Sequence, residues 1–231
     1  MREYKIFHIG DTHTFHNQIV IPPKVDIMIH SGDATNPRDP YTNEKEMREF
    51  IDWYETVNIE HKIFIAGNHD TSTERKFVVK KDFEKAGIIY LEHESVEIEG
   101  LNIFGSPYTP TFGNWAFMKD RAKLDKYWKM IPDNTDIVIV HGPPKTILDL
   151  SYSRDGELEF CGDQALYNNI VNRVRPKLMC FGHIHNYENI HNAGLKQLSN
   201  HPTIFSNGSC VEDGRFEKGI VNNGNLITIT K

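Results

Sequence analysis

Five short polar blocks, each after an apolar run, carry the side chains of this sequence that suit metal chemistry. In chain order the blocks are Asp11-Thr12-His13, Gly32-Asp33, Gly67-Asn68-His69-Asp70, His141-Gly142 and Gly182-His183-Ile184-His185. They offer carboxylate, amide-oxygen and imidazole ligands, a mixture that suits manganese, iron, zinc, nickel or cobalt and needs no thiolate. Two adjacent cations held by such ligands favour attack of water on phosphorus. The residues therefore predict a hydrolase that uses two divalent metal ions.

Two of the blocks contain paired ligands at a spacing of two residues, Asp11 with His13 and His183 with His185. Side chains two positions apart in extended backbone point to the same side, so each pair can address one metal centre. His141 adds a single imidazole after another apolar run.

The middle blocks predict a bridging ligand and an oriented imidazole. Asp33 stands in a block of its own between the others, which gives its carboxylate the natural place to bridge two cations. His69 lies between Asn68, a predicted amide ligand, and Asp70, an acid that can orient the histidine ring.

The elements that position these blocks are predicted to be buried strands. Five apolar runs precede the blocks, at residues 4–9, 26–30, 62–66, 136–140 and 178–181. They are apolar at nearly every position, as expected for strands covered on both faces. Ligands in such sheets gather at the carboxyl ends of the strands, so we expect the five blocks to converge.

Amphipathic helices are predicted between the strands. Met47, Phe50, Ile51 and Tyr54 fall at i, i+3, i+4 and i+7, and Asn43 with Glu46 resembles an N-cap and its N3 partner. Similar spacings indicate helices at residues 124–131 and, after Gly162-Asp163, at residues 166–174.

Alternating patterns predict a hairpin around Glu99-Gly100 within residues 96–104, and further strands near residues 203–205 and 226–230. We therefore expect an α/β fold in which two packed mixed β-sheets are flanked by helices, an αββα sandwich. At 231 residues, the chain is predicted to form a single domain, residues 1–231.

Two long segments without a clear pattern, residues 106–119 and 145–162, are candidates for the rim of a site. The first contains an aromatic cluster that is interpreted either as core packing or as a platform for a nucleobase; its members are Tyr108, Phe112, Trp115 and Phe117. Arg154 and Cys161 in the second are interpreted as a solvated cation and an incidental thiol.

Seven further histidines have no motif support and are predicted to be structural or exposed: His8, His16, His30, His61, His93, His191 and His201. His16 and His30 lie nearest to the ligands in sequence, so contact with a ligand is an alternative for these two.

The charge and composition of the chain limit the kinds of molecule that it is expected to bind. The net charge of -6 excludes the basic surface that binding of a nucleic-acid polymer requires, whereas a small anionic substrate can still bind at cations. Three cysteines form no disulfide framework and indicate a reducing compartment, so a cytoplasmic location is expected. No apolar run reaches the length of a membrane span, and no membrane partner is expected.

The ordered blocks resemble the calcineurin-like metallophosphoesterase superfamily over nearly the whole chain. Further segments resemble its metallophosphoesterase-domain-containing group of class III phosphodiesterases: Gly105-Ser-Pro-Tyr-Thr-Pro, Asn114-Trp-Ala-Phe117, His141-Gly-Pro-Pro144, Arg173-Val-Arg-Pro-Lys177 and Phe181-Gly-His-Ile-His185. That group is known for hydrolysing cyclic nucleotide phosphodiesters.

The resemblance implies a specific division of roles. One metal would be held by Asp11, His13, Asp33 and His185, and the other by Asp33, Asn68, His141 and His183. His69 would protonate the leaving oxygen or stabilise the phosphate, and Asp70 would hold its ring. Asn68, His69 and Trp115 are the candidate substrate contacts.

The predicted reaction is hydrolysis of small phosphodiesters by a hydroxide that bridges two metal ions, with manganese favoured as the metal and 2′,3′-cyclic nucleotides as substrates. Protein phosphatases of the superfamily extend the second block with an arginine that clamps phosphate, whereas this chain reads Gly32-Asp-Ala-Thr-Asn-Pro37. The alternatives are a phosphomonoesterase of broad specificity and a metal-binding scaffold without turnover.

Overall fold

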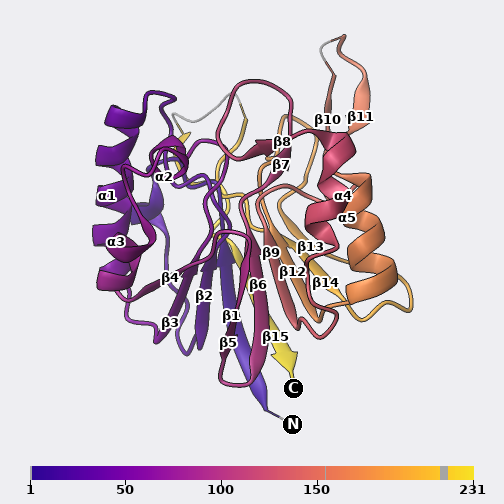
Figure 1. The fold of residues 1–231 in the computed structure, drawn as a ribbon, viewed down its shortest axis with the longest axis horizontal. Helices are drawn as coiled ribbons and strands as arrows, with labels where there is room; N and C mark the ends of the chain where they lie inside the picture. Colours follow the sequence, from indigo (N-terminus) through magenta and orange to yellow (C-terminus); the bar gives the residue numbers. More distant parts are fainter. Residues whose placement is uncertain (1, 154, 214–217) are drawn as a thin grey trace.

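The apolar runs form parallel strands in two sheets (Figure 1). The computed structural model describes residues 2–153, 155–213 and 218–231. In the first sheet the strand order is β15-β1-β2-β3-β4, and only β15 is antiparallel to its neighbour. Its strands are β1 (Glu3–Ile9), β2 (Ile27–His30), β3 (His61–Phe64), β4 (Ile88–Tyr90) and β15 (Asn225–Thr230).

The second sheet has the order β13-β14-β12-β9-β6-β5, with antiparallel pairs at both edges. Its strands are β5 (Glu94–Ile98), β6 (Leu101–Ser106), β9 (Ile137–Val140), β12 (Leu178–Phe181), β13 (Gly194–Gln197) and β14 (Ile204–Asn207). The predicted hairpin is confirmed: Glu99 and Gly100 join β5 to β6 with φ angles of 49° and 87°, as a tight two-residue turn requires.

Both faces of these strands are covered, which explains their unbroken apolar sequences. Ile27 and Ile29 of β2 pack with Ile137 and Ile139 of β9 in the layer between the sheets, whereas Met28 points to the opposite face. Successive side chains of a strand point to opposite faces, so an all-apolar strand needs two cores.

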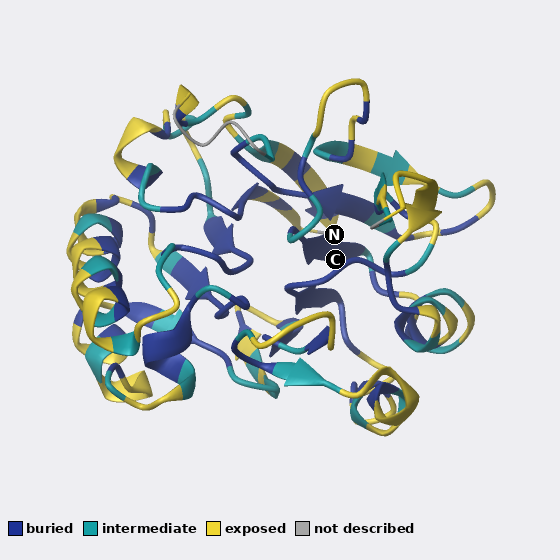
Figure 2. Cartoon of the chain, turned by 90° about the horizontal axis from the view of Figure 1, so that it is seen from above, coloured by how far each residue is buried: buried dark blue, intermediate teal, exposed yellow. Residues whose placement is uncertain are grey.

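Helices cover the outer faces of the two sheets (Figures 1 and 2). Helices α1 (Pro40–Thr56) and α3 (Lys80–Lys85) pack on the first sheet, and α4 (Leu124–Trp128) and α5 (Gln164–Asn169) pack on the second. Short helical segments are η1 (His16–Gln18), α2 (Thr71–Glu74), η2 (Arg121–Lys123) and η3 (Ile170–Val174). The predicted αββα arrangement is confirmed.

The two long segments without a pattern form small ribbons beyond the main sheets. One consists of β7 (Thr109–Pro110) and β8 (Met118–Lys119), and the other of β10 (Leu150–Tyr152) and β11 (Leu158–Phe160). Within the described residues, the helices lack the combination of length and apolar composition that a bilayer span needs.

The predicted start of α1 is wrong. Asp39 is the N-cap, and its carboxylate accepts a hydrogen bond from the Thr42 amide at 3.1 Å. Pro40 occupies the first helical position, where its fixed φ favours helix initiation, so the helix begins earlier than the Asn43 and Glu46 pattern suggested.

The helix predicted at residues 166–174 is not continuous in the structure. It divides into α5 and the wider turn η3, which ends at Arg175 with a φ of 49°. Pro176 follows directly, and a residue before proline is disfavoured in the helical conformation.

A buried histidine forms a polar link between the two sheets. The His8 ring of β1 contacts the Ser206 hydroxyl of β14 through Nδ1 at 2.7 Å and the Ser31 hydroxyl through Nε2 at 3.0 Å. Burial lowers the pKa of His8 from 6.5 to about 3, so the ring is neutral in the folded chain. This confirms the structural interpretation of His8.

The neutral His8 makes folding stability depend on pH. Below pH 6.5 the unfolded chain binds a proton that the folded chain takes up only near pH 3, so the free energy of unfolding decreases as pH falls. In urea titrations of the metal-free protein between about pH 6 and 4.5, His8→Asn should flatten this dependence by up to about 1.4 kcal/mol per pH unit. The same substitution at the exposed His191 should leave it unchanged. Parallel curves for wild type and His8→Asn would contradict the assignment.

Candidate metal centre

The predicted ligands meet where the parallel strands of both sheets end. They follow β1, β2 and β3 in the first sheet and β9 and β12 in the second. Four of them adopt a left-handed backbone, which is strained for residues other than glycine; the φ angles are 49° at Asp11, 41° at His13, 56° at Asp33 and 69° at His183. Strained non-glycine residues cluster at functional sites.

Asp11, His13 and His185 form the first group of ligands, in which one donor atom of each side chain lies within 4.8 Å of the others. A carboxylate oxygen of Asp11 lies 3.2 Å from His185 Nε2. The same carboxylate accepts hydrogen bonds from the His183 amide at 3.0 Å and from the Ser209 hydroxyl at 2.8 Å.

Gly182 allows this approach because a Cβ atom at that position would collide with the Asp11 carboxylate. The glycine of the Gly-His-x-His block is therefore required for space beside the first ligand.

Asp33, His141 and His183 form the second group, again with one donor atom of each within 4.8 Å of the others. Asp33 Oδ2 lies 3.3 Å from His141 Nε2 and 4.0 Å from His13 Nε2 of the first group. The Asn68 amide oxygen lies 2.9 Å from His141 Nε2, which brings the predicted amide ligand to this group. Asp33 thus stands between the two groups, as the bridging prediction requires.

The charges of these groups suit bound cations. Burial opposes a charged ring at His141 and His185, but the Asp33 and Asp11 carboxylates raise the pKa values of these histidines to about 9 and about 10. Burial lowers the pKa of His13 to about 4 and that of His183 to about 3, so both rings are neutral and able to ligate. The donor set and its negative carboxylates fit two divalent metal ions.

Backbone carbonyls fix the orientation of the ligand rings. His13 Nδ1 donates to the Thr35 carbonyl at 3.1 Å, and His141 Nδ1 donates to the Ser31 carbonyl at 2.9 Å. A carbonyl can only accept, so Nδ1 carries the ring proton, and Nε2 is the nitrogen that can bind a cation when the ring is neutral.

A profile of the family described as calcineurin-like phosphoesterase matches residues 4–187. The chain belongs to the calcineurin-like phosphoesterase family. This confirms the family resemblance seen in the ordered blocks, and the αββα arrangement agrees with it.

Curated relatives confirm the narrower similarity. Metallophosphoesterase domain-containing protein 1 of Homo sapiens is 34% identical over 201 residues, which cover 77% of this chain and 59% of that protein. A UPF0046 protein of Caenorhabditis elegans is 33% identical over 194 residues, 77% of this chain and 67% of that protein. Probable rhamnogalacturonate lyase C of Emericella nidulans is 35% identical over 191 residues, 78% of this chain and 17% of that protein. The chain therefore spans less than two thirds of the human relative.

The predicted role of Asp70 is wrong for this member of the phosphoesterase family. Its carboxylate does not hold the His69 ring but accepts hydrogen bonds from the backbone amides of Gly67, Asp33 and Thr35 at 2.7, 2.9 and 3.1 Å. The Thr35 hydroxyl adds a fourth at 2.7 Å. Burial, followed by repulsion from Asp33, raises the pKa of Asp70 to about 7, although the hydrogen bonds that the carboxylate accepts lower it. Asp70 therefore fixes the loop that carries Asp33.

The His69 ring has different partners. Its Nδ1 donates to the Asn36 carbonyl at 2.8 Å, and its ring lies edge-on to His13 with centroids 4.8 Å apart. The His69 amide donates to Asp33 Oδ1 at 2.7 Å. The ring lines the pocket, where it can reach a substrate.

Two residues assigned to a helix cap instead hold the loops of the site. The buried Asn43 amide donates to the carbonyls of His69 and Pro37 at 2.8 and 2.9 Å. Glu46 accepts from the Asn36 amide at 2.9 Å. Sequence reasoning missed this function because both residues also match a helical pattern.

The aromatic cluster divides between the two interpretations. Phe117 is buried and Tyr108 is partly buried, as core packing predicts, whereas Phe112 and Trp115 line the pocket. Trp115 also contacts the His69 ring, with centroids 4.2 Å apart. Arg154 lies outside the described residues, and Cys161 lines the pocket with a pKa raised by burial.

The two histidines nearest to the ligands have structural contacts. His30 is buried and bonds the Thr12 hydroxyl at 2.9 Å and the Gly32 amide at 3.2 Å, which joins the first two blocks. His16 packs against Phe50.

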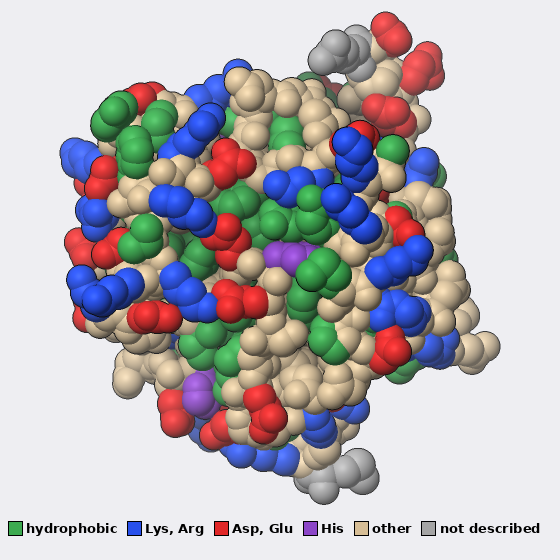
Figure 3. Space-filling view, viewed as in Figure 1, with side chains coloured by type: hydrophobic (Ala, Val, Ile, Leu, Met, Phe, Trp, Pro, Cys, Tyr) green, Lys and Arg blue, Asp and Glu red, His purple; other side chains and the backbone are tan. Residues whose placement is uncertain are grey.

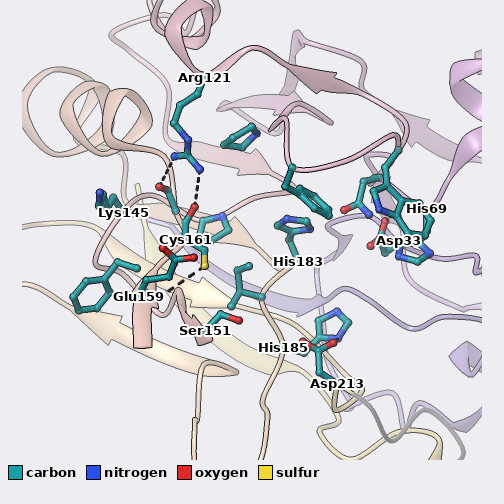
Figure 4. A pocket seen from close by; sticks show the side chains of 18 residues that line it. Asp33, His69, Arg121, Lys145, Ser151, Glu159, Cys161, His183, His185 and Asp213 are labelled. Atoms are coloured by element: carbon teal, nitrogen blue, oxygen red, sulfur yellow. Dashed lines mark hydrogen bonds and ion pairs between the residues drawn. The ribbon is translucent and has the colours of Figure 1, made fainter. Parts of the chain in front are cut away.

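A pocket of about 760 Å³ opens onto the centre. Figure 4 places Asp33 and His69 on one side of His183, and Arg121, Lys145 and Glu159 on the other. Figure 3 shows the molecule from the side, as in Figure 1; lysine and arginine lie beside aspartate and glutamate over much of this face, and hydrophobic side chains gather near its middle.

Asp213 and Ser209 are site residues that the motifs did not reveal. Asp213 Oδ1 lies 2.9 Å from His185 Nδ1, the arrangement in which a carboxylate orients a metal-binding histidine. Ser209 binds the Asp11 carboxylate. The sequence carries a signal for Ser209 alone: the polar segment Asn207-Gly208-Ser209 follows the strand predicted near residues 203–205, as the other polar blocks follow their strands.

Removal of Asp213 should weaken metal binding. Asp213→Ala removes the hydrogen-bond acceptor from His185 and should reduce manganese affinity by roughly 10- to 100-fold. Asp213→Asn keeps an acceptor and should lie between this variant and wild type, because only the charge is lost. Calorimetric titration of the metal-free protein measures the affinity. Asp52→Ala, at an exposed carboxylate on α1, controls for the change in net charge; equal affinities for all four proteins would refute the role of Asp213.

Proposed function

We propose that the chain is a metal-dependent phosphodiesterase that hydrolyses small phosphodiesters at a dinuclear centre. The family match supports phosphoester hydrolysis. The observation that carries the dinuclear proposal is the position of Asp33, whose Oδ2 lies 3.3 Å from His141 Nε2 and 4.0 Å from His13 Nε2. One carboxylate thereby faces both groups of ligands.

The first metal would be held by Asp11, His13, Asp33 and His185, and the second by Asp33, Asn68, His141 and His183. When bound, the two cations supply Lewis acidity to the phosphate oxygens and to water. Manganese is the proposed metal because these oxygen and imidazole ligands suit it.

His69 is the proposed proton donor to the leaving oxygen. The Asn36 carbonyl holds Nδ1, so Nε2 is the nitrogen that remains for the substrate. A positioned acid of this kind contributes about a hundredfold to ten-thousandfold to the rate when the leaving group is poor. Asp70 acts on this step only through the loops that it fixes.

The pocket supports an organic phosphodiester rather than inorganic phosphate alone. Its volume of about 760 Å³ falls in the range of small-molecule sites. Pro110, Phe112 and Ile184 give it apolar walls, and Lys145 adds a cation at the end away from Asp33. We infer cyclic nucleotides as substrates, with 2′,3′-cyclic diesters favoured, because such a pocket offers surface for both a base and a charged group.

The alternatives have less support. A phosphomonoesterase must bind a dianionic group, but Arg38, the arginine nearest to the second block, lies over the Trp115 ring at 3.7 Å and does not line the pocket. Arg121 does line the pocket, and its guanidinium donates to the backbone carbonyls of Gly162 and Cys161. A scaffold without turnover needs no oriented acid, whereas the His69 ring is held by the Asn36 carbonyl and by contacts with the rings of His13 and Trp115.

A cytoplasmic location and a single domain formed by residues 1–231 belong to the same proposal. Cys161, Cys180 and Cys210 are free thiols, which agrees with a reducing compartment. The core between the two sheets joins strands from both ends of the chain.

The first test is hydrolysis of bis(p-nitrophenyl) phosphate with added manganese. Wild type should turn over, and chelation should abolish turnover. Asp33→Ala should lower kcat/KM by roughly a thousandfold, because both ligand groups lose their shared carboxylate. Asp52→Ala controls for charge. A flat trace with manganese, zinc, iron, nickel and cobalt would refute the phosphodiesterase proposal.

The second test compares substrates. A 2′,3′-cyclic nucleotide should give a higher kcat/KM than its 3′,5′-cyclic isomer and than a nucleoside monophosphate. His69→Ala should lower kcat for the cyclic nucleotide by roughly 100-fold or more, since an alkoxide leaves poorly without a proton. Preference for the monophosphate would favour the phosphomonoesterase.

A further inference from the structure

We propose that Arg38 and Trp115 form a stack that positions the His69 ring for proton transfer, so that Trp115 is a positioning residue and not a platform for the nucleobase. This inference rests on the proposed function. Its three members come from distant segments: Arg38 precedes α1, His69 follows β3, and Trp115 lies between the short strands β7 and β8.

The rings are in direct contact. The centroids of His69 and Trp115 lie 4.2 Å apart with an interplanar angle of 34°, and the Arg38 guanidinium carbon lies 3.7 Å above the Trp115 ring. A guanidinium over an indole is attracted by the electrons of the ring face, and tryptophan is the best such partner. Arg38 therefore holds the indole, and the indole packs against the histidine.

The backbone beside Trp115 is tied to the same site. The Ala116 amide donates to the Asn68 carbonyl at 3.0 Å, and the Phe117 amide donates to Glu74 Oε1 at 2.7 Å. These bonds attach the segment that carries the indole to the block that carries His69. The backbones that carry the two rings are thus bonded to each other.

Of the two aromatic rings that contact His69, Trp115 lies more nearly parallel to it, at 34°, than His13 does. Asn36 holds Nδ1, and His13 meets the ring edge-on at 87°. Without the indole, the ring can tilt about the Nδ1 hydrogen bond. Displacement of a catalytic group by about 1 Å can cost roughly a hundredfold in rate.

The contacts also argue against the platform interpretation. Trp115 already carries a cation and an imidazole within 4.2 Å of its ring. Stacking of a nucleobase would have to displace one of these partners or use the part of the indole that they leave open.

The two interpretations predict different substrate dependence for Trp115→Ala. Four diesters separate the base from the leaving group: a 2′,3′-cyclic nucleotide, glycerol 1,2-cyclic phosphate, thymidine 5′-(p-nitrophenyl phosphate) and bis(p-nitrophenyl) phosphate. If Trp115 positions His69, kcat should fall by roughly 10- to 100-fold for the two cyclic esters, because their leaving group is an alkoxide that needs a proton. For the two nitrophenyl esters, whose nitrophenolate leaves without one, kcat should fall by less than about threefold. KM should change little. A loss confined to the two substrates with a base would overturn the proposal.

Matched variants test the stack itself. Arg38→Gln should lower kcat for the cyclic esters by less than Trp115→Ala does, with the same small effect on the nitrophenyl esters. Arg38→Lys should lose less kcat than Arg38→Gln because a cation remains over the indole ring. Arg48→Gln changes another exposed arginine, in the middle of α1 and paired with Glu44, and should behave as wild type. In a His69→Ala background, Trp115→Ala should add less than about a twofold further loss, because the group that it positions is absent. Independent, multiplying losses would overturn the proposal.

A measurement without turnover separates this inference from the proposed function. In isotope-labelled, metal-free protein, Trp115→Ala should shift or broaden the NMR signals of the His69 ring, while Trp115→Phe, which keeps an aromatic face, should retain them. Unchanged His69 signals in folded Trp115→Ala protein would overturn the inference. If the wild-type protein hydrolyses none of the four diesters, the proposed phosphodiesterase function is refuted. The NMR result would still decide whether Trp115 positions the His69 ring.

Discussion

The buried Asp70 carboxylate is the constraint on which the rest of the site depends. A carboxylate in a dry interior is stable only when hydrogen bonds replace its water, and Asp70 obtains these from Gly67, Asp33 and Thr35. A hydrogen bond contributes about 0.5–1.5 kcal/mol, and about 1.5–3 kcal/mol when its partner is charged, so the four that Asp70 accepts favour one loop arrangement, most strongly when the carboxylate is ionised. That arrangement keeps Asp33 at a φ of 56°, a conformation that a free loop would leave. The position of Asp33, the proposed shared ligand, is thus set by a residue that belongs to neither group of candidate ligands.

The two sheets supply the frame for this arrangement. Because the strands before the ligands run parallel within each sheet, their carboxyl ends deliver side chains to one edge. The layer of isoleucines between the sheets brings the edges together, and His8 adds a polar tie to Ser206. Ligands from β1 and β12 can then share contacts across the interface, as Asp11 does with the His183 amide. The candidate metal centre therefore depends on the interface between the two sheets and not on either sheet alone.

The sequence predicted the strands, the sandwich and the convergence of the blocks because these follow from hydrophobic periodicity and strand direction. It failed where one side chain has two plausible partners. Asn43 fits a helix cap equally well, and only the position of Pro40 moves the helix start to Asp39. The His69 ring is held by the carbonyl of Asn36, and a carbonyl has no sequence signature. Asp213 lies outside any motif, so its contact with His185 depends on chain packing that spacing does not encode.

The carboxylates show why residue type alone does not decide a role. Asp33 and Asp11 have imidazole nitrogens as close neighbours, at 3.3 and 3.2 Å, and these are positions where a cation can replace a proton. The hydrogen bonds that Asp70 accepts come from backbone amides and a hydroxyl, groups that cannot be replaced without unfolding the loop. All three are buried aspartates at the same end of the sheets. Two things therefore distinguish the candidate ligands Asp11 and Asp33 from Asp70, which holds a loop: the donor that each carboxylate faces, and whether a cation can take the place of that donor's proton.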